Sequence, residues 1–331
     1  MPNPLRSLSC RRAVLAVAAA AMLTVPAARA ETLRLFTVGT ASLAGNYYAA
    51  GRAICAKINR EGPQDLRCSP EPTPGSQYNL LGLRKGELDF AFVQSDWQHR
   101  AYEGVGPFAG AAMRNLRSVM SLYAEAVTLV VRGNGGIGSI DDLTGRAVDL
   151  GNPSTARRGT VDRVLRGFGV APDTFGRIAE LSTAAVGQEL CAGRIDAAFI
   201  VIGHPNARLG ETLRRCDLRL VSLDGAEVRR FVEASEDFES YAIPAGTYAA
   251  EPEAVRTVST LATLITRSDI DDALVGYVAR TIIDRYDVLA QRVPALGRRD
   301  LDAMRRAGLT APLHPAAAAA FDAAQAADDS Q

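Results

Sequence analysis

The chain has 331 residues, with 37 Lys plus Arg and 37 Asp plus Glu, so its formal net charge at pH 7 is zero. This balance excludes a protein that binds nucleic acid through a strongly basic surface, and we expect no nucleic-acid partner. The length is sufficient for two lobes, each with its own core.

The N-terminus is typical of a secretory signal peptide covering residues 1–30. Three arginines precede an apolar run from Ala13 to Val25, and an Ala-Arg-Ala sequence before Glu31 offers a cleavage site. The run is short for a membrane span, although an uncleaved anchor remains the alternative. The Arg11-Arg12 pair leaves the twin-arginine route open beside the general one. We therefore expect an exported, periplasmic protein, whose mature part has 33 basic and 37 acidic residues.

Four cysteines remain after the signal peptide, and the two pairs closest in sequence are Cys55 with Cys68 and Cys191 with Cys216. An even number of cysteines in an exported chain predicts disulfides, and we expect these two pairings. A metal site is the alternative. It is disfavoured because no two cysteines have a C-x-x-C spacing and the three histidines are scattered. We expect no metal and no cofactor.

Apolar runs alternate with amphipathic stretches along the mature chain, which predicts an α/β fold. LRLFTV predicts a strand, and apolar residues then recur at helical spacing from Tyr47 to Ile58. A helix is predicted over 77–85 and should end at Gly86. LDFAFV, just beyond it, predicts a buried parallel strand, and Asp96 is a suitable N-cap for the next helix.

The later part of the chain continues this alternation. EAVTLVVR, RAVDLG and RIDAAFIVIG predict strands, and a helix is predicted over 161–168. Two further helices are predicted over 253–266 and 270–290, and the Ala-rich tail from Pro315 is also predicted to be helical.

Four loops follow the carboxyl ends of predicted strands, and this is the edge where open α/β sheets bind ligands. They cover 39–46, 94–96, 151–158 and 203–206. The first, within VGTASLAGNYYAAG, combines small residues and hydroxyls at the start of a helix. Such a loop can bind a small anion through backbone N–H groups. The alternative is an ordinary strand-to-helix connection with a good N-cap.

Seven blocks of the sequence, taken in chain order, carry a family resemblance. VGTASLAGNYYAAG resembles GTGSTGGTYYPVG, a signature of the TAXI family, the solute-binding subunits of tripartite ATP-independent periplasmic (TRAP) transporters. The block TPGSQYNLLGLRKGELDFAFVQSDWQHRAYEG resembles the GS-x-x-N and VQSD region of the family. The block LRSVMSLYAEAVTLVVR resembles the family's LYPE strands, with Ala124 where proline is usual. The remaining blocks are DLTGRAVDLGNPSTARRGT, DAAFIVIGHPN, IPAGTY and APLHPAAAAAF.

The resemblance implies a type II periplasmic-binding-protein fold, with two α/β lobes joined by crossing hinge strands. One lobe would comprise 31–121 and 240–331, and the other 122–239. It also implies capture of a small organic anion or amino acid, such as glutamate or another carboxylate. The protein, a monomer, would deliver this solute to separate TRAP permease subunits.

The predicted ligand contacts combine hydroxyl and amide donors with one guanidinium. Arg158 stands where the family has its arginine, and its planar fork suits a carboxylate. Pairing with Asp162 is the alternative for Arg158. Tyr47 would form a wall of the site or belong to the core, and the hydroxyl residues could instead cap helices. The remaining candidates are Thr40, Ser42, Gln94, Ser95, Ser154 and Thr155.

The sequence departs from the family in one loop, where GSGTR is replaced by Ser154-Thr155-Ala156-Arg157-Arg158. Two glycines are lost and an arginine is added, which leaves the identity of the solute open. A periplasmic sensor that reports to a membrane signalling protein is the alternative function. An enzyme is disfavoured because the three histidines have no evident nucleophile partner and no phosphate-binding or dinucleotide motif is complete.

Overall fold

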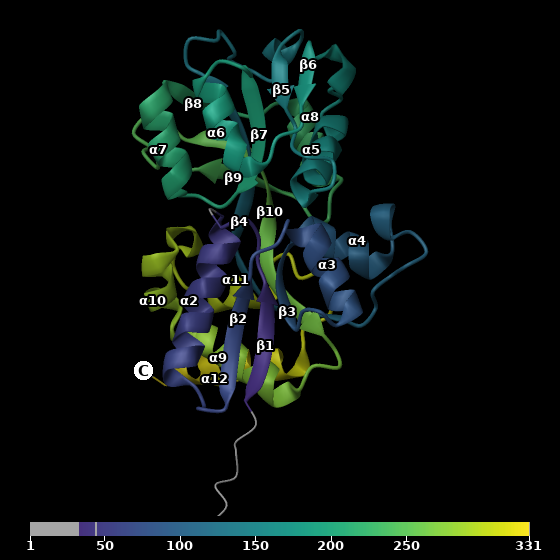
Figure 1. Cartoon of the computed structure of the whole chain (residues 1–331), viewed down its shortest axis with the longest axis vertical. Coiled ribbons are helices and arrows are strands. Elements are labelled where there is room, and N and C mark those ends of the chain that lie inside the picture. Colours follow the sequence, from purple (N-terminus) through teal and green to yellow (C-terminus); the bar gives the residue numbers. More distant parts are fainter. Residues whose placement is uncertain (1–32, 44, 331) are drawn as a thin grey trace, which may run out of the picture. The chain divides into compact units, whose positions relative to one another are not determined.

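The structure of the protein is a computed structural model that describes residues 33–43 and 45–330 (Figure 1). The predicted signal peptide, residues 1–30, lies outside the described residues. The chain from Leu35 onward forms one compact unit.

Ten strands of the described residues belong to one sheet. They are β1 (Arg34–Gly39), β2 (Leu66–Glu71), β3 (Phe90–Gln94), β4 (Leu116–Arg132), β5 (Ala147–Asp149), β6 (Arg177–Ala179), β7 (Ala197–Ile202), β8 (Leu218–Val221), β9 (Glu239–Ile243) and β10 (Val255–Arg267).

The helices alternate with these strands, as the sequence predicts for an α/β chain. They are α2 (Asn46–Glu61), α3 (Ser76–Lys85), α4 (Ser95–Glu103), α5 (Ala156–Gly167), α6 (Thr183–Cys191), α7 (Ala207–Cys216), α8 (Ala226–Glu233), α9 (Asp272–Asp284), α10 (Tyr286–Arg292), α11 (Leu301–Arg306) and α12 (Pro315–Asp328). Among the described residues, no helix has both the length and the apolar character needed to cross a membrane.

The strand order is β2-β1-β3-β10-β4-β7-β5-β6, with β8 paired to β4 and β9 to β10. The two longest strands, β4 and β10, run antiparallel to each other from Leu116 to Ala126 of β4. Beyond that point β4 pairs with β7, up to Val131. Both strands therefore belong to two groups of elements, one around β1–β3 and one around β5–β8 (Figure 1).

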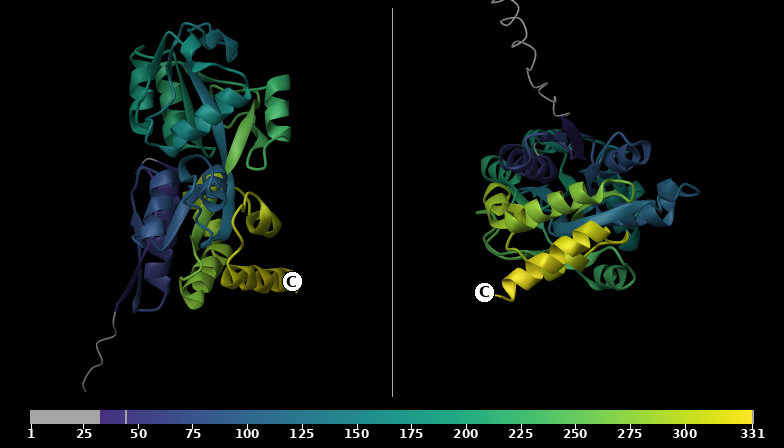
Figure 2. Two further views of the ribbon diagram at one scale, coloured as in Figure 1. Left: turned by 90° about the vertical axis from the view of Figure 1, so that its right-hand side faces the viewer. Right: turned by 90° about the horizontal axis from the view of Figure 1, so that it is seen from below.

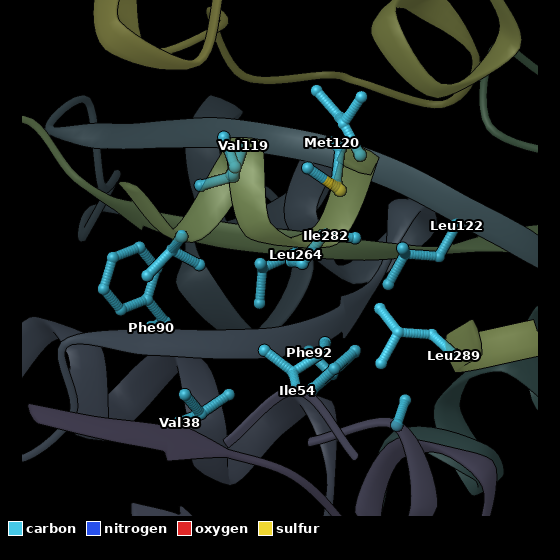
Figure 3. Close-up of a cluster of buried hydrophobic side chains, with 14 of the residues drawn as sticks. Val38, Ile54, Phe90, Phe92, Val119, Met120, Leu122, Leu264, Ile282 and Leu289 are labelled. Carbon is cyan, nitrogen blue, oxygen red and sulfur yellow. The ribbon is translucent and has the colours of Figure 1, made fainter. Parts of the chain in front are cut away.

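The core around β1–β3 lies between the sheet and helices α2, α9, α10 and α12. It includes Ile54 of α2, Phe90 and Phe92 of β3, Leu264 of β10 and Ile282 of α9, none of which is more than 3% exposed (Figure 3). β3 is buried along its whole length, which explains why its sequence is an uninterrupted apolar run.

Separate buried clusters surround β5–β8. One lies among α5, α8, β5 and β7, and includes Val148, Val164 and Phe199. Two residues of the segment 239–258 also belong to these clusters. Val258 lies in the cluster beside α5, and Ile243 lies in another. The lobe boundaries given above stay a prediction.

The helix predicted over 253–266 is wrong, because this segment is strand β10. Its sequence, VRTVSTLATLITR, is rich in valine, isoleucine and threonine, whose branched Cβ atoms favour extended backbone. It is also the central strand of the sheet, hydrogen-bonded to β3, β4 and β9. In contrast, the helix predicted over 77–85 is confirmed as α3, and Gly86 ends it with a left-handed φ of 74°.

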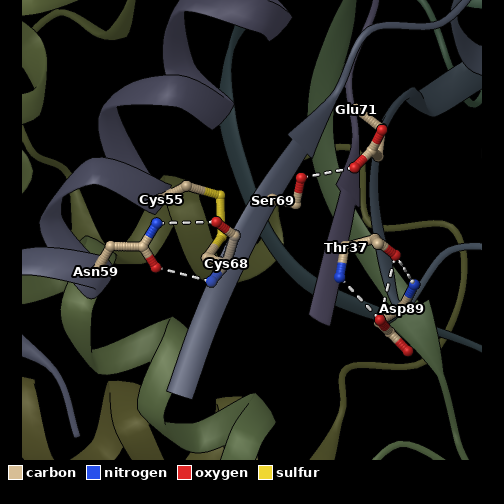
Figure 4. The surroundings of a disulfide bond; sticks show 7 residues. All are labelled: Thr37, Cys55, Asn59, Cys68, Ser69, Glu71 and Asp89. Atoms are coloured by element: carbon tan, nitrogen blue, oxygen red, sulfur yellow. Dashed lines mark hydrogen bonds between the residues drawn. A yellow bond between two sulfur atoms is a disulfide. The ribbon is translucent and has the colours of Figure 1, made fainter. Parts of the chain in front are cut away.

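Both predicted disulfides are present, Cys55–Cys68 and Cys191–Cys216. The first joins α2 to β2 (Figure 4). Beside it, the Asn59 side chain donates to the Cys68 carbonyl and accepts from the Cys68 N–H, at 3.0 and 2.8 Å. The second joins the C-termini of α6 and α7.

Candidate functional site

Residues from all four loops that follow strand ends line a cavity of about 1290 Å³. Ser42 and Asn46 come from the first loop, Gln94 from the second, Thr155 from the third and Asn206 from the fourth. Its volume exceeds the few hundred Å³ that a small solute needs. We refer to this space as the cavity.

Hydrogen bonds connect the first and fourth loops beside the cavity. Asn46, the first residue of α2, donates through Nδ2 to the Gly203 carbonyl at 2.9 Å. The Asn206 side chain donates to Asn46 Oδ1 at 3.1 Å, and its own Oδ1 accepts from the Leu209 N–H at the start of α7. The starts of α2 and α7 are therefore held together at the cavity.

The cavity wall contains a buried carboxyl, Glu125 of β4, which is 6% exposed. Tyr47 of α2 donates its hydroxyl to Glu125 Oε2 at 2.5 Å. Burial raises the pKa of Glu125 to about 8, and the negative charge of Asp96 acts in the same direction while the Tyr47 hydrogen bond opposes it. Near neutral pH, this carboxyl is therefore largely protonated.

Gln94, at the end of β3, lines the cavity and is only 5% exposed. Its backbone N–H donates to Ser76 Oγ at 3.1 Å, whereas its side-chain amide makes no hydrogen bond to another described residue. Buried amides normally have partners. This side chain therefore offers donors and an acceptor to whatever occupies the cavity.

Arg157 of α5 also lines the cavity but is fixed by protein partners. Its guanidinium pairs with Asp149, which is fully buried at the end of β5, and its Nε donates to the Phe199 carbonyl at 2.7 Å. The positive charge of Arg157 is therefore compensated within the protein.

Arg158, the predicted carboxylate ligand, is not among the residues that line the cavity. Its Nε donates to Asp162 Oδ1 at 2.8 Å, and its Nη1 donates to Glu180 Oε1 at 3.0 Å. The pairing with Asp162 is the alternative that the sequence left open. The assignment of Arg158 to the solute stays a prediction.

The eight predicted contact residues divide into two groups of four. Those that line the cavity are Ser42, Tyr47, Gln94 and Thr155. The others are not part of the lining, and three of them have hydroxyls with protein partners. Thr40 donates to the Glu71 carbonyl, Ser95 pairs with Thr260, and Ser154 donates to Asn152 Oδ1. Contact of any of the eight with a solute stays a prediction.

Sequence reasoning did not select Glu125 or Arg157 for the site. The motif LYAEA offered a signal for Glu125, because an acid inside a long apolar strand is costly to bury without a partner. In the sequence, Arg157 belongs to the altered loop 154–158, in which an arginine is added. No local pattern predicts that its guanidinium pairs with Asp149 at the end of another element.

A second polar cluster joins α4 to α5. Asp96 of α4 accepts a 2.8 Å hydrogen bond from Thr160 of α5, and both side chains are fully buried. The Trp97 indole N–H donates to the Ala156 carbonyl at 3.1 Å and to Thr160 Oγ1 at 3.2 Å. A Cβ on Gly159 would lie 2.6 Å from Trp97 Cζ2, so glycine permits this close approach.

The structure is similar in fold to solved structures of other proteins. PhnD1 from Prochlorococcus marinus, in complex with methylphosphonate, matches with a TM-score of 0.52 at 13% identity over 80% of this chain and 90% of that one. The periplasmic aliphatic sulphonate binding protein SsuA from Escherichia coli has a TM-score of 0.49 and 16% identity, over 88% of this chain and 83% of that one.

The fold is therefore that of the two-lobed periplasmic binding proteins, as predicted. Residues 38–322 match the NMT1-like family, and the chain belongs to this family.

Proposed function

We propose that the protein is a periplasmic solute-binding protein that captures a small organic anion or amino acid in the cavity. The observation that carries the proposal is the cavity itself, because the four loops that follow strand ends all contribute to its lining. Its lining includes the hydroxyl residues Ser42, Tyr47 and Thr155 and the amide of Gln94, and the Tyr47 and Thr155 hydroxyls also donate to protein acceptors. Polar groups in this number orient a small solute.

We further propose that the protein serves a TRAP transporter as a TAXI-type subunit and acts as a monomer. The ordered sequence blocks, from VGTASLAGNYYAAG to APLHPAAAAAF, support this assignment. Uptake of the bound solute by cells should require both this protein and the TRAP permease subunits. Binding without any effect on uptake would support the sensor function instead.

Native mass spectrometry of the protein as exported and purified tests solute binding. One small molecule per chain should be released on denaturation, and adding the same compound to the refolded protein should raise its melting temperature. A chain that carries no solute, and that none of a broad set of organic acids and amino acids stabilises, would contradict the proposed function.

A further inference from the structure

Resting on the proposed function, we propose that Glu125 is the specificity-determining residue of the cavity and that it binds a protonated amino group of the solute. The cavity would thus select amine-bearing solutes over simple carboxylates.

The position of Glu125 is the first reason. It lies on β4, lines the cavity, and is 6% exposed. Its only side-chain partner among the described residues is the Tyr47 hydroxyl, 2.5 Å from Oε2. Tyr47 itself lines the cavity and is buried. Tyr47 thus fixes one oxygen of the carboxyl at the cavity wall, and no donor from the part of the chain that the structure describes bonds to the other oxygen.

The distribution of charge is the second reason. Arg157 is the buried cation of the cavity lining, and Asp149 already compensates it. The other arginines of the lining are exposed, three on α7 and one at the end of α10. A buried carboxylate without a cation is unfavourable. A solute ammonium would supply the missing positive charge and hydrogen-bond donors.

The groups around Glu125 make its binding to an amine sensitive to pH. Tyr47 of α2 and Tyr123 of β4 have pKa values raised well above 10 by burial, so both stay neutral. His204, after β7, is also neutral because burial lowers its pKa to about 4. Asp96 of α4 adds negative charge, and the paired residue on β10, Thr260, does not titrate.

Because burial raises the pKa of Glu125 to about 8, an ammonium must bind with loss of the Glu125 proton to solvent. Below pH 8 the carboxyl must first ionise, so affinity for an amine should rise as pH increases from 6 to 8, by up to tenfold per pH unit, and then level off. A solute carboxylate that accepts the Glu125 proton as a hydrogen bond would show the opposite dependence.

Titration calorimetry with matched pairs tests the proposal: L-glutamate and glutarate, L-alanine and propionate, L-phenylalanine and 3-phenylpropionate. At least one amino compound should bind tenfold or more tightly than its partner. Its binding should release a proton, measured from the dependence of the enthalpy on the buffer. Glu125→Gln should remove this preference, whereas Glu233→Gln at the exposed end of α8 should retain it.

The wild-type measurements suffice if Glu125→Gln does not fold. Equal or tighter binding of the compounds without the amino group would overturn this proposal and leave the proposed function intact. So would a co-purified solute that contains no amino group. If no compound of either kind binds and no solute is carried by the purified protein, the proposed function fails as well.

Discussion

The Thr160 hydroxyl donates a 2.8 Å hydrogen bond to Asp96 Oδ2, and this bond connects α5 to the start of α4. The Thr260 hydroxyl of β10 donates to the other oxygen, Asp96 Oδ1, at 3.4 Å. Asp96 is fully buried, and burial raises its pKa to about 6, with the charge of Asp237 adding to the effect. Arg100, Arg163 and the Thr160 hydrogen bond act in the opposite direction, without offsetting the burial.

The first prediction is the pH dependence that Asp96 contributes to stability. Since its pKa is higher in the folded chain than the ordinary 3.8, folding binds a proton between these values. The contribution of Asp96 to the free energy of unfolding should therefore fall, by about 2 kcal/mol, as pH rises from 4 to 6. Urea unfolding of the wild type and Asp96→Asn at both pH values measures it. Parallel pH profiles for the two proteins would show that Asp96 ionises normally.

The second prediction uses Trp97, the single tryptophan of the chain. Its indole lies against Ala156 and Gly159 of α5, whose first turn also lines the cavity. Solute binding that closes the two halves by a hinge should change the environment of this ring. We expect a saturable change in tryptophan emission and a smaller radius of gyration by small-angle scattering.

Gly159→Ala should shift the emission of the free protein and weaken solute binding several-fold, because the added Cβ would lie 2.6 Å from Trp97 Cζ2. Gly138→Ala is the matched control, with its nearest atom 3.7 Å away. Emission and radius that both stay constant at saturating solute would argue against closure.

The third prediction separates the two adjacent arginines. Arg157→Ala leaves the fully buried Asp149 without its cation, and should lower the free energy of unfolding by about 3–5 kcal/mol. Arg158→Ala removes two partly exposed ion pairs and should cost less than about 1 kcal/mol. Chemical unfolding of both variants gives the comparison, and equal losses would be inconsistent with the contrasting burial.

The same pair of variants tests the sequence-based role of Arg158. If its fork binds the solute carboxylate, Arg158→Ala should lower affinity tenfold or more while the fold stays intact, and Arg158→Lys should recover only part of this loss. Unchanged affinity of Arg158→Ala would remove Arg158 from the site.

The fourth prediction concerns the disulfides. On the chain-entropy model, closing loops of 13 and 25 residues stabilises the fold by about 3 and 3.5 kcal/mol. Cys55 and Cys68 are buried, whereas Cys191 is exposed. Mild reductant should therefore open Cys191–Cys216 first, as followed by thiol labelling and peptide mapping. Preferential labelling of Cys55 would contradict the observed burial.

Local sequence patterns were sufficient for much of the fold. The apolar run of β3 predicts a buried strand, and every residue of β3 is buried. The helix α3 has an apolar face and ends at a glycine. The pattern failed at β10, where apolar residues and threonines occur on both faces of a central strand. Without alternation, the spacing does not distinguish a buried strand from a helix.

The candidate site was only partly predictable for a similar reason. Ser42, Gln94 and Thr155 could be selected because they lie where predicted strands end. The carboxyl ends of the strands mark the ligand-binding edge of the sheet, and they can be located from the order of elements along the chain alone. Glu125 depends on Tyr47, which is 78 residues away, and Arg157 depends on Phe199, which is 42 residues away. Such pairings arise from tertiary contacts, and no periodicity in the sequence encodes them.

The most direct test of solute binding in the cavity is titration calorimetry of two matched variants with the co-purified solute. Ala49 lines the cavity on an exposed position of α2, and Ala56 is an exposed residue of the same helix that is not part of the lining. We predict that Ala49→Trp fills cavity space and weakens binding at least tenfold, while Ala56→Trp binds like the wild type. Equal affinities for all three proteins would contradict binding in this cavity.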